Sequence, residues 1–219
     1  MQHELFRRAH HDPLTDLPNR ILFDDRLQQA IARSQRRERK VAVLCIDLDE
    51  FKQINDQYGH GTGDRLLQEV ASRLRSRLRT TDTVARIGGD EFLAVIEDLS
   101  DTEAVATVAE SLLRSFGEPF SFADAVMRAT ASIGAAVFPA DGTTTEELKR
   151  HADLAMYRAK EPGGNTYEVF SAVLSQKLAR RREIERYLRE ALQTEGFELH
   201  YQPIYTVAQE LVGLEALLR

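Results

Sequence analysis

Cysteine is almost absent from this sequence of 219 residues, in which Cys45 is the only one. A lone thiol cannot form a disulfide within the chain, so a fold stabilised by internal disulfides is excluded. Cys45 lies inside an apolar run, where cysteine behaves as a small buried hydrophobic residue. This usage is typical of the reducing cytoplasm. We therefore expect a cytoplasmic chain, whether or not a longer parent protein is tethered to a membrane.

Long apolar runs and an excess of positive charge are also missing. No run approaches the ~20 apolar residues of a membrane-spanning helix, and the amino terminus lacks the apolar core of a secretory signal. We therefore expect no membrane contact from this segment. The 29 basic residues are outnumbered by 35 acidic residues, which argues against a nucleic-acid partner. The length allows one domain of ordinary size with an appendage.

Two apolar runs joined by a diglycine occupy Val84–Ile96 (VARIGGDEFLAVI). Branched and aromatic residues fit a half-buried strand, and Gly88 and Gly89 supply the positive φ angles that a tight turn needs. The pattern therefore predicts a β-hairpin. Asp90 and Glu91 follow the diglycine directly, so the hairpin holds two carboxylates at its tip.

A second acidic strand end lies upstream. Residues 41–48 form an almost unbroken apolar run, which is typical of a central strand covered on both faces, and the run ends in Asp47-Leu48-Asp49. If this strand pairs with the hairpin, Asp47 and Asp90 converge. Carboxylate oxygens suit Mg²⁺ completed by water and substrate phosphates, so a nucleoside triphosphate is the natural ligand.

The remaining periodicity predicts an α+β protein. The expected helices are 21–39, 50–57, 62–79, 101–116 and 144–160, and a further β segment covers 126–138. Residues 171–195 form a charged helical stretch that we interpret as a connector. Strands and helices in this order are compatible with a largely antiparallel sheet flanked by helices.

Four further blocks accompany Ile87–Phe92 in the order of a known family. They are Asp47–Asp56, His11–Arg20, Ser132–Pro139 and Ala152–Lys160. Together the five blocks resemble the GGDEF family of diguanylate cyclases. The resemblance implies a palm-like, mostly antiparallel central sheet flanked by helices, similar to that of nucleotide cyclases.

The resemblance also implies a reaction. Two GTP molecules, each held by one domain of a homodimer, would condense to cyclic di-GMP with release of two pyrophosphates. Asp47, the carbonyl group of Leu48 and Asp90 match the family's metal ligands for Mg²⁺, or Mn²⁺ in its place. Either Asp90 or Glu91 would assist deprotonation of the attacking hydroxyl, and the sequence leaves the division of these roles open.

Five further positions match the family's nucleotide contacts. Lys52 would stabilise the transition state as a catalytic residue, and Lys160 would bind phosphate. Without the resemblance, a single lysine would be interpreted as a solvent-exposed residue. Asn55 and Asp64 would read guanine, whose adjacent donors a carboxylate can accept, and His60 lies in the same stretch. Asp64 also falls in the first turn of the helix expected at 62–79, where capping is an alternative role.

Arg79 and Asp82 resemble the RxxD site through which many members of the family bind cyclic di-GMP as an inhibitor. Arginine can hold phosphate or a guanine edge bidentately, and the acid can accept from guanine donors. The sequence departs from the family pattern at Gly164, where the family often has an arginine that contacts phosphate.

The resemblance divides the chain into four parts. We expect a truncated linker at 1–10, a GGDEF domain at 11–170, a connector helix at 171–195 and the first two strands of an EAL phosphodiesterase domain at 196–219. The EAL segment ends at its signature triplet, so Glu215 cannot support hydrolysis here. Three functions stay open: an active cyclase, a weak GTP-binding domain that regulates the attached phosphodiesterase, and a cyclic di-GMP receptor.

Overall fold

A computed structural model describes residues 7–37, 39–101, 103–122, 126–161, 163–171, 198–206 and 208–218. The chain divides into two compact units, Met1–Ala172 and Val173–Arg219, which are described separately. The charged connector helix expected at 171–195 lies almost wholly outside the described residues. Within them, no helix combines the length and the apolar character needed to cross a bilayer.

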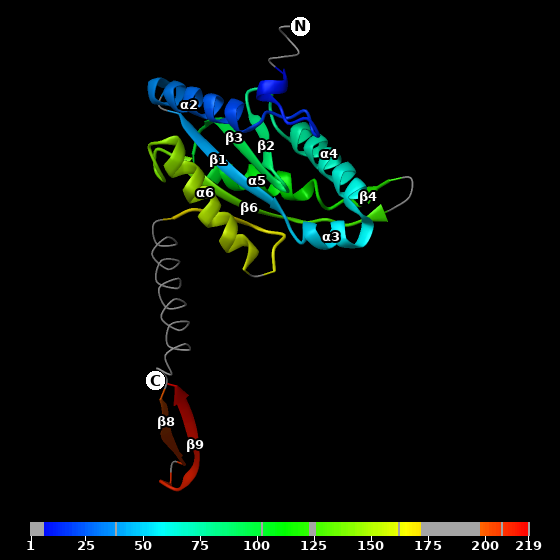
Figure 1. The fold of residues 1–219 in the computed structure, drawn as a ribbon. Coiled ribbons are helices and arrows are strands. Elements are labelled where there is room, and N and C mark those ends of the chain that lie inside the picture. The colour runs from blue at the N-terminus through cyan, green and yellow to red at the C-terminus, as the bar shows by residue number, and fades with distance from the viewer. Residues whose placement is uncertain are drawn as a thin grey trace. The chain divides into compact units, whose positions relative to one another are not determined.

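The first unit is built on a mixed five-stranded sheet (Figure 1). The strand order is β2-β3-β1-β6-β7, in which only the β6–β7 pair is parallel. The strands are β1 (Lys40–Leu48), β2 (Thr83–Gly88), β3 (Glu91–Leu99), β6 (Ala131–Phe138) and β7 (Tyr167–Val169). This architecture confirms the expected α+β fold with a mostly antiparallel central sheet.

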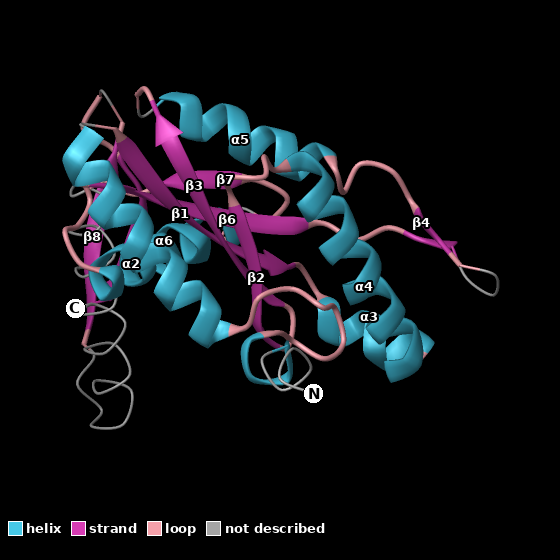
Figure 2. Cartoon of the chain, turned by 90° about the horizontal axis from the view of Figure 1, so that it is seen from above, coloured by secondary structure: helices cyan, strands magenta, loops and turns pink. Residues whose placement is uncertain are grey.

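Helices cover both faces of this sheet (Figure 2). They are α2 (Arg20–Arg37), α3 (Phe51–Tyr58), α4 (His60–Arg77), α5 (Glu103–Arg114) and α6 (Thr145–Lys160). α2 and α6 contact one another on one side of the sheet, and α4 and α5 contact one another on the other. A separate two-stranded ribbon, β4 (Phe120–Ser121) and β5 (Val126–Met127), extends from the body.

β1 is the middle strand, and its residues from Val41 to Leu48 are all buried. Successive side chains of a strand point to opposite faces. Leu44 and Ile46 accordingly join the core beneath α4 and α5, while Cys45 and Asp47 point to the side of α6. Burial raises the pKa of the Cys45 thiol, so this residue acts as the buried hydrophobe that the sequence predicts.

α6 begins with a capping box, in which the Thr144 hydroxyl accepts the Glu147 N–H and the Glu147 carboxylate accepts the Thr144 N–H. Its middle lies directly on Gly134 of β6. A β-carbon at Gly134 would lie 2.0 Å from the Met156 backbone nitrogen and 2.1 Å from the Ala152 carbonyl oxygen. The close approach of helix and strand therefore depends on glycine at this position.

The second unit contains an antiparallel hairpin of β8 (Leu199–Tyr205) and β9 (Leu211–Leu218). Its apolar side chains are largely exposed, as at Tyr201 and Leu214, each 61% accessible. The two strands agree with the strands expected at the carboxyl end. β4 and β7 were not expected from the sequence, because segments of two or three residues carry too little alternation to indicate a strand.

Gly134→Ala should destabilise the first unit by about 1–3 kcal/mol or more, because the added carbon would meet rigid backbone atoms. Gly61→Ala is the matched control, since a β-carbon there has no neighbour within 4 Å. It should be neutral or stabilising by up to ~1 kcal/mol. Chemical denaturation measures both. Equal stability of the two variants would contradict the packing described here.

Candidate active site

The diglycine forms the tip of the β2–β3 hairpin. Gly88 pairs with Glu91 across the strands, which leaves Gly89 and Asp90 as the two turn residues. Gly89 has a φ of +54°, in the left-handed region that glycine adopts without strain. Asp90 is therefore held in the turn itself, and Glu91 begins the returning strand.

The register of β1 against β3 brings the two acidic segments together. Asp47 lies directly opposite Glu91 in this antiparallel pair. Opposed residues project from the same face with Cβ atoms about 5 Å apart. Asp90 immediately precedes Glu91, so three carboxylates gather where the end of β1 meets the hairpin, as the sequence predicted.

Lys160, the last residue of α6, contacts this cluster. Its Nζ donates to Asp47 Oδ1 at 2.5 Å, and the Asp47 side chain is only 10% exposed. Burial raises the pKa of Asp47, and although Lys160 opposes this effect, repulsion from Asp90 and Glu91 adds to it. The net pKa lies above the ordinary value because one ammonium does not compensate for burial and two neighbouring acids.

This excess of negative charge suits a divalent cation. The donors are hard carboxylate oxygens, which Mg²⁺ prefers. Glu91 lies opposite Asp47 in the strand pair, and Asp90 is close enough to repel the Asp47 carboxylate. In the described part of the chain, no group of three acidic, histidine or cysteine side chains is preassembled in metal-binding geometry. A cation at Asp47 would therefore require the neighbouring carboxylates to move closer together.

The residues expected to bind the nucleotide follow β1 on α3 and α4. Lys52 is an exposed residue in the first turn of α3, and His60 is the exposed first residue of α4. Asn55 lies against the first turn of α4, since a β-carbon at Gly63 would lie 2.0 Å from Asn55 Oδ1. Asn55 is thereby placed beside the turn that leads to Asp64.

The capping role considered for Asp64 is wrong. α4 begins at His60, two residues earlier than expected, and its N-cap Gly59 offers no side-chain hydrogen bond. Asp64 consequently lies beyond the first turn with an exposed side chain. The first turn of α4 therefore gives its carboxylate no structural role as a cap.

An arginine that the sequence analysis did not single out holds the turn that carries Asp90. Arg86 donates to the Gly89 carbonyl oxygen from Nε at 3.0 Å and from Nη2 at 2.8 Å. Its Nη1 donates to both oxygens of Asp12, at 3.0 and 3.2 Å. Burial alone would raise the pKa of Asp12, but hydrogen bonds from Thr15 and Arg86 hold it below the ordinary value.

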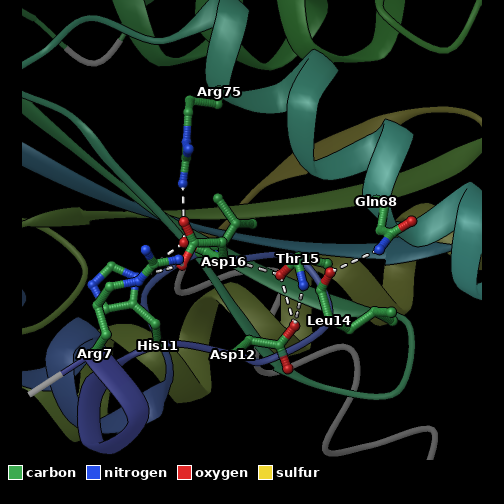
Figure 3. A network of polar contacts seen from close by, with 9 residues as sticks. Arg7, His11, Asp12, Leu14, Thr15, Asp16, Gln68 and Arg75 are labelled. Atoms are coloured by element: carbon green, nitrogen blue, oxygen red, sulfur yellow. Dashed lines mark hydrogen bonds and ion pairs between the residues drawn. The ribbon is translucent and has the colours of Figure 1, made fainter. Parts of the chain in front are cut away.

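Asp12 belongs to an opening segment, residues 11–18, that is fastened to α4 (Figure 3). Arg75 donates to the Asp16 carbonyl oxygen at 3.2 Å, and Gln68 donates to the Leu14 carbonyl oxygen at 3.1 Å. The opening segment thus links the helix layer to the turn that carries Asp90. The only sign of this segment's structure in the sequence is the Asp-x-x-Thr pattern, which favours a turn closed by a hydrogen bond to the aspartate side chain.

Arg79 and Asp82 lie just before β2, at the opposite end of that strand from Asp90. Six residues of strand separate the two ends by about 20 Å. Asp82 accepts the backbone N–H of Arg79 at 3.0 Å and that of Glu97 at 3.2 Å. Both residues line a pocket of about 250 Å³, to which Arg26 and Arg75 also contribute. The pocket is therefore separate from the carboxylate cluster.

Comparison with known proteins bears on the family and the fold. The family model for the diguanylate cyclase GGDEF domain matches residues 9–166. MucR of Pseudomonas aeruginosa, a bifunctional diguanylate cyclase/cyclic di-GMP phosphodiesterase, is 46% identical over 217 residues, which cover 99% of this chain but 32% of MucR. The chain thus spans about a third of the length of this relative.

Solved structures show the same fold. The isolated GGDEF domain of TpbB (YfiN) from Pseudomonas aeruginosa superposes with a TM-score of 0.75 at 36% identity, over 78% of this chain and 99% of that domain. The coiled coil and GGDEF domain of DgcB from Caulobacter crescentus, solved in complex with cyclic di-GMP, superpose with a TM-score of 0.69 at 28% identity. The match covers 77% of this chain and 89% of that chain. This chain belongs to the GGDEF diguanylate cyclase domain family.

Proposed function

We propose that the first unit is an active diguanylate cyclase, which condenses two GTP molecules to cyclic di-GMP and two pyrophosphates. The observation that carries the proposal is the register that opposes Asp47 to Glu91 beside Asp90, with Lys160 against Asp47. Each nucleotide's 3′-hydroxyl would attack the α-phosphate of the other. Phosphoryl transfer depends mainly on alignment and charge neutralisation, and this cluster suits both.

Each residue has a distinct task in this proposal. Asp90 or Glu91 accepts the proton of the attacking hydroxyl. Lys52 and Lys160 hold the phosphates. Asp47, the Leu48 carbonyl group and Asp90 hold magnesium, or manganese, which when bound neutralises the phosphate charge that develops during transfer.

Base selection is assigned to the α3–α4 pair. Asn55 and Asp64 accept the adjacent donors of guanine, and His60 lies at the start of the same helix as Asp64. Adenine does not offer this donor pattern. Bound adenine would leave polar groups of the site without a partner, and well-built sites of this kind favour the correct ligand by about 10⁴-fold. The close approach at Gly63 keeps Asn55 beside α4.

The pocket at Arg79 and Asp82 is assigned to product inhibition. Arg26, Arg75 and Arg79 are among the residues that line it, and arginine side chains suit the two phosphates of a cyclic dinucleotide. The solved complex of DgcB with cyclic di-GMP supports a ligand of this class for the family.

A second function has its own support. Likeness to the bifunctional MucR extends over 99% of this chain, beyond the residues that match the GGDEF model. We therefore assign residues 171–195 to a connector and 196–219 to the start of an EAL phosphodiesterase domain. In that setting a weak GTP-binding domain would regulate the phosphodiesterase, and Gly164 in place of the family's arginine favours this reading. A pure cyclic di-GMP receptor would need only the pocket at Arg79.

Asp90→Ala should lower the rate of cyclic di-GMP synthesis by about 10³-fold or more, because several kcal/mol of charge stabilisation would be lost. The melting temperature should not change. Asp98→Asn, at the far end of β3, is the control and should keep full activity, since asparagine tolerates its φ of 55°. Turnover of GTP with Mg²⁺ is measured by product formation.

The same assay separates the competing functions. GTP binding without product in the unaltered protein would select the regulatory domain. Binding of cyclic di-GMP without binding of GTP would select the receptor. Equal activity in Asp90→Ala and the unaltered protein would contradict the assignment of Asp90.

Specific activity should rise with protein concentration, because two half-sites must face one another and a monomer holds one. Turnover is measured across a dilution series beside the oligomeric state by light scattering. A specific activity that stays constant while the protein is monomeric throughout would contradict a dimeric active site.

Arg79→Ala should raise the inhibition constant of cyclic di-GMP about tenfold or more, as expected for loss of a charged, bidentate contact. Arg77→Ala removes the same charge two residues away, from an exposed position at the end of α4, and should leave inhibition unchanged. Inhibition curves at fixed GTP distinguish the two. Matching shifts in both variants would indicate a general charge effect instead of a binding site.

A further inference from the structure

Asp49, the second acid of the Asp47-Leu48-Asp49 run, makes contacts that the sequence did not indicate. Its Oδ2 accepts the Thr130 hydroxyl at 2.7 Å and the Asn165 backbone N–H at 2.9 Å. Its Oδ1 accepts the Ser132 hydroxyl at 2.6 Å. The carboxylate therefore joins the end of β1 to β6 and to the loop that follows α6.

These contacts leave Asp49 little capacity for a cation. A carboxylate offers about four lone-pair sites, and three are occupied by donors of this chain. The backbone N–H of Asp49 also donates to the Thr130 carbonyl oxygen at 2.9 Å, which fixes the residue against β6. Asp47, two residues earlier, instead contacts Lys160 and faces the hairpin acids.

The loop after α6 is fastened close to Lys160. The Gly163 N–H donates to the Lys160 carbonyl oxygen at 3.1 Å, and the Thr166 carbonyl oxygen accepts the Ile133 N–H at 3.0 Å. Asn165 between them is held by Asp49. Two links thus run side by side from the end of β1, one to Lys160 and one to the loop that follows it.

Gly164 allows the second link. It has a φ of +77°, and a β-carbon there would lie 2.6 Å from Asp49 Cγ. The backbone of the loop therefore rests on the carboxylate itself. This contact explains in physical terms why glycine suits a position where the family often has arginine.

We propose that Asp49 is a positioning residue, which clamps the loop after α6 so that Lys160 is held against Asp47. It acts through Lys160 and is not a metal ligand. The part played by Lys160 in nucleotide binding rests on the proposed function, whereas the clamp is a property of the fold.

Two substitutions separate positioning from metal binding. In Asp49→Asn the amide oxygen can accept from Thr130 and Asn165, while the amide nitrogen donates to the Ser132 hydroxyl oxygen. The clamp is then kept although the charge is lost. Asp49→Ala removes both the clamp and the charge. Asp56→Ala, an exposed acid on α3, is the control for loss of one negative charge.

Amide hydrogen exchange of residues 163–166 tests the clamp without a ligand. Exchange should accelerate in Asp49→Ala and stay close to that of the unaltered protein in Asp49→Asn and Asp56→Ala. Unchanged exchange in Asp49→Ala would overturn the clamp. If exchange follows this pattern but the unaltered protein binds no GTP, the clamp stands and the proposed function fails.

Calorimetry with a non-hydrolysable GTP analogue tests the action through Lys160. Asp49→Ala should weaken binding about tenfold, the size of one charged hydrogen bond, yet have almost no effect in a Lys160→Ala background. Equal effects in both backgrounds would overturn the positioning role. A loss of Mn²⁺ affinity in Asp49→Asn as large as in Asp49→Ala would identify Asp49 as a metal ligand instead.

Discussion

The ion pair between Lys160 and Asp47 is the contact on which the rest of the site depends. It joins the end of the central strand to the end of α6, and it places a single positive charge beside three carboxylates. The Asp47 side chain is nearly buried, and electrostatic interactions inside a protein are stronger than in water. The attraction to Lys160 and the repulsion between the carboxylates are therefore both strengthened. The cluster keeps an excess of negative charge, which in the proposed function a bound cation would balance while it binds the nucleotide phosphates.

Two further sets of contacts fix the geometry around this pair. The β1–β3 register opposes Asp47 to Glu91, and the Arg86 guanidinium holds the turn that carries Asp90. Arg86 is itself anchored by Asp12 in the opening segment. Because His11 and Pro18 of the same segment line the pocket at Arg79, a ligand in that pocket would contact a segment that is connected to the turn carrying Asp90.

Local patterns were enough to predict the hairpin, the buried strand and most helix positions, because each is indicated by the spacing of apolar residues over a few positions or by turn-forming residues. The contacts of Asp49 with Asn165 and of Arg86 with Asp12 were not predictable, since they join residues 116 and 74 positions apart. Such contacts are set by register and packing. The capping role of Asp64 was predicted wrongly because α4 begins two residues earlier than expected, after Gly59, which has no side chain that could mark a cap in the sequence.

Diffraction from crystals grown with Mn²⁺ and a non-hydrolysable GTP analogue tests the central claim most directly. The anomalous signal of manganese locates the cation independently of the surrounding atoms. The account predicts a peak bonded to the carboxylates of Asp47 and Asp90 next to the nucleotide phosphates. Bound nucleotide with manganese on its phosphates alone, and neither carboxylate in contact with it, would contradict the account.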